Sequence, residues 1–166
     1  MNELYLMVTI TERGSARQFL TLFARYHVTV TLSALGAGTA RSELLDYFGL
    51  EKTEKVVAFS VVTRSTWRSV KSAMQRELNI DVPGTGIAFI IPLSSIGGKK
   101  PLAFLTDGQD FEAGEESALK DTKYELLVVI ANQGYTELIM DAAREQQAGG
   151  GTVLHAKGTG MEKAEK

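Results

Sequence analysis

Four runs of apolar and β-branched residues mark predicted strands in the first half of the chain. They cover residues 4–10, 28–36, 55–63 and 86–93. These runs are apolar at successive positions rather than at every second position, which is typical of strands that are buried on both faces. Gly14, Gly36 and the segment 81–86 provide turns after or between them.

Two segments between these runs have helical spacing instead. In the first, which ends near His27, apolar residues recur at i, i+3, i+4 and i+7: Ala16, Phe19, Leu20 and Phe23. Ser15 and Gln18 before them have the spacing of a capping box. In the second, which begins near Ser65, the expected buried face consists of Trp67, Val70, Met74 and Leu78.

The order of elements is therefore β-α-β-β-α-β. It predicts an α+β fold of the ferredoxin-like type, with the helices on one face of an antiparallel sheet. Because the strands are apolar on both faces, we expect the helix-free face to be buried against other subunits or another domain.

The same pattern starts again after a polar segment. Residues 94–122 are dense in Gly, Asp and Glu, so a linker at 101–122 is expected between a module at 1–100 and the start of a second at 123–166. Glu125-Leu126 repeats Glu3-Leu4, and a strand, a helix at 136 to about 147, and a strand within 149–160 follow. The first module is thus expected to precede a partial second repeat.

Two strands and one helix bury little of a sheet on their own. The half-module either completes itself against the first module or another chain, or the sequence is a fragment of a longer tandem protein. We favour the fragment.

Composition limits the classes of function. The chain has 166 residues, 44% of them hydrophobic, with a net charge of -2, which gives no electrostatic reason to expect nucleic acid or an anionic membrane. No apolar run is long enough for a membrane span. Absence of cysteine fits a cytoplasmic protein without disulfides. His27 and His155 do not form a metal-ligand pattern, so no metal site is predicted.

Glycine pairs are the recurring special feature of the sequence. They occur at Gly36-Ala37-Gly38, Gly84-Thr85-Gly86 and Gly158-Thr159-Gly160. Glycine lets backbone N–H groups approach an anion closely, as in phosphate-binding turns. None of the three continues as a dinucleotide fingerprint or a P-loop. The alternative is that each is a tight turn at the end of a strand.

Four features together resemble the PII nitrogen-regulatory signal proteins. They are the βαββαβ order, the glycine turn that ends the second strand, the long excursion after it and the "GTGIAF" turn before the fourth strand. The resemblance covers residues 3 to about 100, and 123–166 as the start of another module. It implies a regulator of nitrogen metabolism, not an enzyme, in which three subunits pack their sheets inward. An adenine nucleotide (ATP, ADP or AMP) would lie between neighbours, and a loop after the second strand would engage a partner protein. The implied nucleotide-binding residues are Gly36, Gly38, Gly84, Thr85, Gly86, Lys99, Lys100, Gly158 and Gly160.

The sequence departs from the family at several positions. Ile87 stands where the family has a phosphate-binding lysine, and Ala40 and Glu162 stand where a glutamine helps to hold magnesium and 2-oxoglutarate. A methyl group cannot coordinate a metal, so neither of these two ligands is expected. Lys99-Lys100 takes the place of paired arginines, and either neutralises phosphate charge or is a solvated pair.

The loop after the second strand has helical spacing. Leu44, Leu45 and Phe48 precede Gly49, which predicts a short amphipathic helix that docks on the body of the protein or on a partner. Tyr47 is expected to be buried rather than modified.

Three functions from different classes stay open. The first is the PII-like sensor, and the second is a structural or oligomerising module in which the glycines only turn the chain. The third is an acylphosphatase-like enzyme, for which Arg13 is present but the rest of the pattern is missing. His155 is expected to be a hydrogen-bonded structural residue, Lys157 to be exposed, and Trp67 to be part of the core.

Overall fold

The computed structural model describes residues 3–38, 54–112 and 124–159. They belong to two compact units, one formed by 1–117 with 156–166 and the other by 118–155. Each unit is described separately below.

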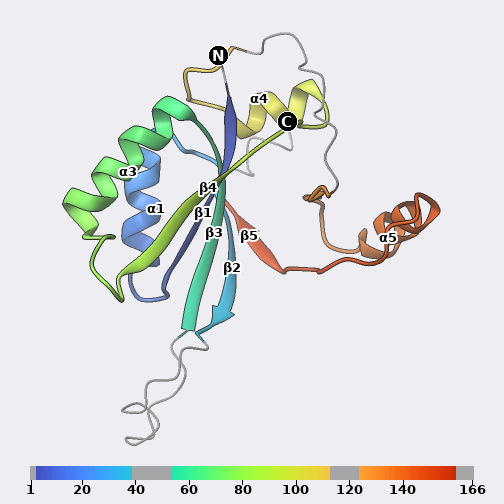
Figure 1. Cartoon of the computed structure of the whole chain (residues 1–166), viewed down its shortest axis with the longest axis horizontal. Helices are drawn as coiled ribbons and strands as arrows, with labels where there is room; N and C mark the ends of the chain where they lie inside the picture. Colours follow the sequence, from blue (N-terminus) through green and yellow to red (C-terminus); the bar gives the residue numbers. More distant parts are fainter. Residues whose placement is uncertain (1–2, 39–53, 113–123, 160–166) are drawn as a thin grey trace, which may run out of the picture. The chain divides into compact units, whose positions relative to one another are not determined.

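The first unit contains a five-stranded antiparallel sheet (Figure 1). Its strands are β1 (Leu4–Glu12), β2 (Leu32–Ala37), β3 (Glu54–Thr63), β4 (Gly86–Pro92) and β5 (Ala156–Gly158). Their order across the sheet is β4-β1-β3-β2-β5. The first four strands have the connections and the order of a ferredoxin-like fold, so the predicted α+β class is confirmed.

Two helices, α1 (Ala16–Arg25) and α3 (Arg64–Leu78), pack together on one face of this sheet (Figure 1). The core between helices and sheet is formed by Tyr5, Met7, Phe19, Leu22, Phe23, Val28, Val62, Val70, Ala73 and Met74. Helical periodicity identified four of these correctly, namely Phe19, Phe23, Val70 and Met74. Trp67 and Leu78 are only partly buried against the core, because they lie at its margin.

The two helices begin differently. The capping box predicted at α1 is wrong, because Ser15 makes no side-chain cap bond and its Oγ reaches the carbonyl of Glu12 at 3.3 Å instead. At α3, the Thr63 side chain accepts a hydrogen bond from the Thr66 amide at 3.1 Å. This cap satisfies one of the amides that a helix start leaves without a partner.

The second strand is shorter than the sequence indicates. Val28 and Val30 are buried, but they precede β2, which begins at Leu32. Thr159 completes the edge beside this stretch, since its amide donates to the Thr31 carbonyl at 2.9 Å and its Oγ1 accepts from the Thr31 amide at 3.0 Å. Buried apolar residues thus continue beyond the hydrogen-bonded strand.

The segment expected to be a linker contains a helix, α4 (Lys99–Leu105). Gln109 follows this helix, and its side-chain amide bonds to β3 as a neighbouring strand would. Its Nε2 donates to the Val61 carbonyl at 2.7 Å, and its Oε1 accepts from the Thr63 amide at 3.0 Å. The residues around 99–109 are therefore attached to the first unit, in contrast to a free linker.

The second unit contains the predicted helix, α5 (Thr136–Glu145). The strand predicted over 124–131 is not formed. Of the strand expected within 149–160 only β5 forms, and it belongs to the sheet of the first unit. A high strand propensity over a short run is therefore not sufficient to form a strand.

Candidate functional site

The glycine turn before β4 begins at an exposed residue, Gly84. Gly84 has a φ of +95° with open space around the position of a Cβ, a conformation that favours glycine. The Thr85 amide donates to the Val82 carbonyl at 3.2 Å, so this amide is already used within the chain.

Gly86 is glycine for a different reason. A Cβ on this residue would lie 2.9 Å from the Ile10 carbonyl oxygen and 3.2 Å from the Thr11 methyl group. The close approach of β4 to β1 therefore excludes a side chain at this position. Gly84, by contrast, has no such packing role.

Gly36 and Gly38 lie at the same end of the sheet as this turn but on the other side of it. Across the sheet, Gly36 is level with Lys55 and Glu12. Gly86 pairs with Thr11, the residue before Glu12, so the two glycines lie at nearly the same height along the strands. Two strands separate β2 from β4, so the two glycine turns are roughly 14 Å apart at a spacing of about 4.8 Å per strand. One copy of the chain does not form a single cradle from both turns.

The remaining predicted ligands lie elsewhere. Gly158 pairs with Leu32, halfway along the sheet. Lys99 and Lys100 form the first turn of α4, at the end of the sheet opposite the Gly84 turn (Figure 1); the amide of nearby Leu93 donates to the Leu4 carbonyl, at the start of β1. Within one copy of the chain, these lysines do not face the glycine turns.

Several predicted positions lie outside the described residues. They are the partner-loop residues Leu44, Leu45, Tyr47 and Phe48, together with Ala40, Gly160 and Glu162.

A groove that the sequence did not predict runs between α3 and β4, with a volume of about 350 Å³. Trp67, Lys71 and Gln75 line it from the helix at i, i+4 and i+8. The rest of its lining consists of Met74, Ile80, Asp81, Gly86, Ile87 and Ala88. The helical spacing of 67, 71 and 75 is visible in the sequence, but the open strand opposite them is not.

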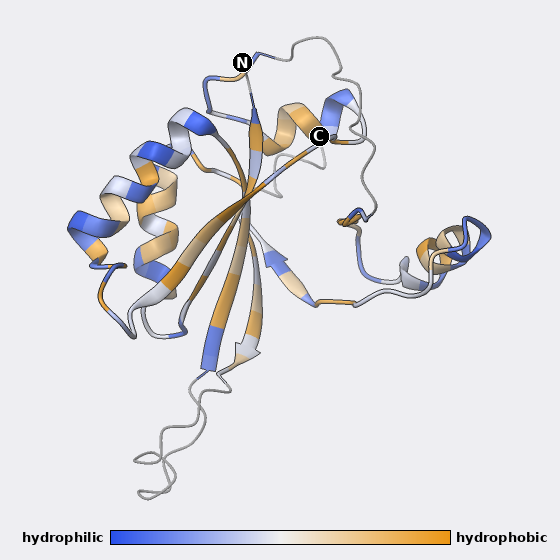
Figure 2. Cartoon of the chain, in the orientation of Figure 1, coloured by the Kyte–Doolittle hydropathy of each residue, from blue (hydrophilic) through white to orange (hydrophobic). Residues whose placement is uncertain are grey.

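The face of the sheet that α1 and α3 do not cover is apolar. Strand alternation and register place Leu6, Val8, Ile10, Val57, Phe59, Val61, Ile87, Phe89 and Ile91 on it. Ile87 is 60% exposed and Phe89 41% exposed, whereas Val8 and Val61 are already buried within the chain. Figure 2 shows hydrophobic positions along these strands. Apolar side chains exposed side by side are typical of a surface that contacts another molecule.

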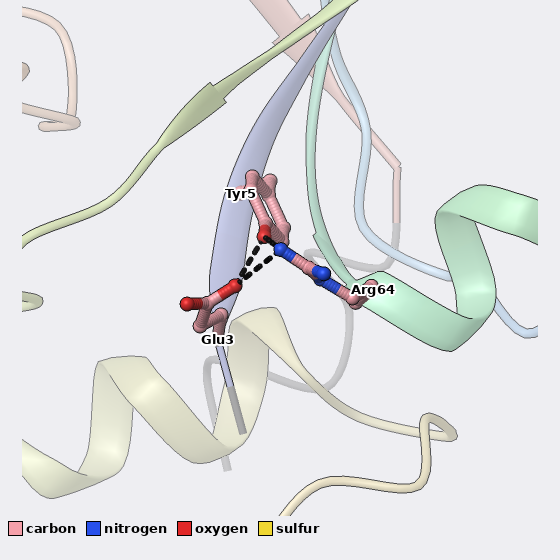
Figure 3. Close-up of polar contacts among 3 residues, drawn as sticks. All are labelled: Glu3, Tyr5 and Arg64. Atoms are coloured by element: carbon pink, nitrogen blue, oxygen red, sulfur yellow. Dashed lines mark hydrogen bonds and ion pairs between the residues drawn. The ribbon is translucent and has the colours of Figure 1, made fainter. Parts of the chain in front are cut away.

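A polar cluster joins the start of β1 to the start of α3 (Figure 3). The Tyr5 hydroxyl donates to Glu3 at 2.5 Å and accepts from Arg64 at 2.9 Å, and Arg64 also donates to Glu3 at 2.8 Å. The Tyr5 hydrogen bond, followed by the charge of Arg64, lowers the pKa of Glu3 below its ordinary value of 4.5. All three groups are engaged with one another, so the cluster joins elements and offers no free acid or base.

The remaining histidine and lysine predictions have mixed outcomes. His155 is exposed and precedes β5, so its expected place inside an apolar strand is wrong. Lys157 is exposed, as predicted. Over the described ranges, no three acidic or histidine side chains form a group that could hold a metal ion, and no helix has the length and apolar content needed to cross a membrane.

The fold and this site define a ferredoxin-like α+β protein with a glycine turn at the open edge of its sheet. No protein-family model matches the sequence, and no curated protein matches it. Among solved structures, a Bacillus cereus protein related to NIF3 is similar, with a TM-score of 0.43 and 18% identity over 57% of this chain and 26% of that chain.

Two structures of B. subtilis GlnK are also similar. The complex with ATP gives a TM-score of 0.37 and 21% identity over 55% of this chain and 85% of that chain. The other GlnK structure gives 0.38 and 21% over 55% and 86%. These likenesses are partial, and the fold assignment above depends on the strand order of this chain.

Proposed function

We propose that the protein is a PII-like regulator that binds an adenine nucleotide and acts on a partner protein in nitrogen metabolism. The observation that carries the proposal is the turn at Gly84, which is exposed, has a positive φ and lies beside open space at the edge of the sheet. Such a turn can present backbone amides to phosphate oxygens.

The nucleotide site of this proposal needs more than one copy of the chain. Gly84, Thr85 and Gly86 of one copy would face Gly36 and Gly38 of its neighbour, because these turns lie on opposite sides of the sheet within one copy. Burial of the apolar helix-free face would hold the copies together, in a trimer-like homo-oligomer. Lys99, Lys100, Gly158 and Gly160 remain proposed contacts that also depend on this assembly.

Signalling in this proposal uses the segment after β2. A nucleotide that binds one arrangement of residues 39–53 more tightly than another would shift the population between them, and a partner that contacts Leu44, Leu45, Tyr47 and Phe48 would detect the shift. The proposed protein has one complete module at 1–100 and the start of a second at 123–166, and it is cytoplasmic.

Calorimetric titration of the chain with ATP, ADP and AMP tests the proposal. We expect saturable binding of at least one of them, and a loss of affinity on the order of tenfold in Gly84→Ala, because a Cβ keeps the phosphate away from the amides. Gly134→Ala is the matched control, since Gly134 also has a positive φ, +98°, and open space around its Cβ position but lies in another turn. If none of the three nucleotides binds, the sensor proposal is refuted.

A structural or oligomerising module without a ligand is the second candidate. The packing of Gly86 against the Ile10 carbonyl favours it, because this glycine is needed for the fold alone. For such a module, Gly86→Ala would lower stability, the apolar face would still drive self-association, and no nucleotide would bind.

A further inference from the structure

The outer edge of β4 has free backbone groups. Within the described chain, β4 pairs only with β1, and just beyond the strand the Leu93 amide donates to the Leu4 carbonyl at 3.0 Å. Residues of an antiparallel strand alternate between bonding to the neighbour and facing away from it. Counting back from Leu93, the backbone groups of Ile90, Ala88 and Gly86 therefore face the open edge.

This edge lacks the usual protection against another strand. The sequence of β4, GIAFIIP, contains no charged residue, whereas exposed edges commonly carry lysine, bulges or an interrupting proline. Its proline, Pro92, is the last residue of the strand, so it does not interrupt strand pairing along the six residues before it. An added strand would find apolar surface on both of its faces: Met74 and Ile80 in the groove on the helix side, and Ile87 and Phe89 on the other.

The chain contains a segment with complementary properties. Five consecutive apolar side chains are more than half exposed, from 52% to 81%: Leu126, Leu127, Val128, Val129 and Ile130. They belong to neither a helix nor a strand, although Val and Ile favour strands. A segment that is apolar at every position suits a strand whose two faces are both covered, which is the environment that the β4 edge provides.

The chain's own attachments favour donation to another copy. Before the segment, Gln109 is bonded to the end of β3, and after it β5 is paired with β2. Gln109 is attached to the middle strand, β3, and β5 is the outer strand on the β2 side, while β4 is the outer strand on the opposite side. The chain therefore rejoins the sheet at the edge opposite β4.

We infer that residues 126–130 of one copy add as a strand to the open edge of β4 in a second copy, alongside the groove formed with α3. Main-chain hydrogen bonds to Gly86, Ala88 and Ile90 supply the pairing, and alternate side chains enter the groove. The contact joins two different surfaces, so it is head-to-tail and can close into a ring, including a ring of three. It does not depend on nucleotide binding.

The experiment measures the mass of the chain in solution by light scattering over a range of concentrations. Val129→Lys is compared with Val153→Lys, because the two valines are 52% and 53% exposed and only Val129 lies in the proposed strand. We expect self-association of the unaltered chain, a dissociation constant raised on the order of tenfold or more by Val129→Lys, and no change with Val153→Lys.

Crosslinking identifies the surface and the copy. The chain has no cysteine, so single cysteines can be introduced as Gln75→Cys, in the groove of one copy, and as Val128→Cys or Val129→Cys in a second copy with a different tag. A short bis-maleimide should join differently tagged copies. Because consecutive side chains point to opposite faces of a strand, only one of the two valine positions should react efficiently.

The inference is overturned by any of three results. The chain could be monomeric at all concentrations, the two lysine variants could associate equally well, or crosslinks could form only within a single chain that carries both cysteines. Since neither lysine replaces a buried residue, loss of folding is not expected, and circular dichroism of both variants checks this point.

Discussion

The cap at the start of α3 gives a quantitative test of the structure. Thr63 is 5% exposed, and its Oγ1 accepts from the Thr66 amide at 3.1 Å. Thr63→Ala removes this acceptor, and replacing an N-cap threonine by alanine costs about 1 kcal/mol, within a range of roughly 0.5–2. For a domain of about 100 residues, 1 kcal/mol corresponds to a fall of roughly 4–8 °C in Tm.

Two controls make the test specific. Thr63→Ser keeps the hydroxyl and should recover most of the loss. Ser15→Ala, at the start of α1, should change the free energy of unfolding by less than about 0.5 kcal/mol, because Ser15 makes no side-chain cap bond.

Urea unfolding followed by far-UV circular dichroism measures all three variants, and the fluorescence of Trp67, the only tryptophan, reports on α3 itself. The reasoning fails if Ser15→Ala costs as much as Thr63→Ala, or if Thr63→Ser restores nothing. Either result would mean that the cap is not the source of the loss.

Three further predictions follow from single contacts. Gly86→Ala should destabilise the fold by about 1–3 kcal/mol through overpacking, whereas Gly36→Ala, whose Cβ would meet only a methyl group at 3.8 Å, should cost clearly less in the same thermal melts. Because the folded-state pKa of Glu3 is lowered, its contribution to stability is present above about pH 4.5 and is lost as pH falls through the folded-state pKa. Glu3→Gln should flatten this part of the plot of unfolding free energy against pH. An unchanged plot would contradict the assignment. Gln109→Ala leaves two strand groups of β3 without their partner and should cost about 1–2 kcal/mol in urea unfolding, so a neutral effect would show that water replaces it.

The sequence identified the elements whose signal is local and strong. Phe19, Phe23, Val70 and Met74 repeat at helical spacing and form the core between helices and sheet. The start of the second strand was misplaced because Val28 and Val30 are buried without belonging to it. An apolar run reveals burial, but it does not reveal where hydrogen bonding to a neighbour begins.

Features that depend on a distant partner were missed. The run at 124–131 has the composition of a strand, yet it does not form one in the structure. The helix α4 was overlooked because glycines precede it and Pro101 lies in its first turn, where proline is tolerated. The groove beside α3 is formed by residues on separate elements, so no sequence spacing specifies it.

The site residues illustrate the same limit. The exposed, positive-φ turn at Gly84 agrees with the glycine pattern, but no spacing in the sequence indicates that Gly36 and Lys99 lie far from it. Their placement follows from the order of strands in the sheet, which only long-range pairing determines.

The contact between Thr31 and Thr159 has a consequence for the order of events in folding. The two residues are 128 positions apart, so bringing them together carries the loop-closure entropy of most of the chain while forming only a few hydrogen bonds. The four-stranded sheet, by contrast, closes through shorter connections and buries the core. Attachment of β5 is therefore expected to be the last and most easily reversed step, and amide exchange at Thr159 should be much faster than at Val62 in the centre of the sheet.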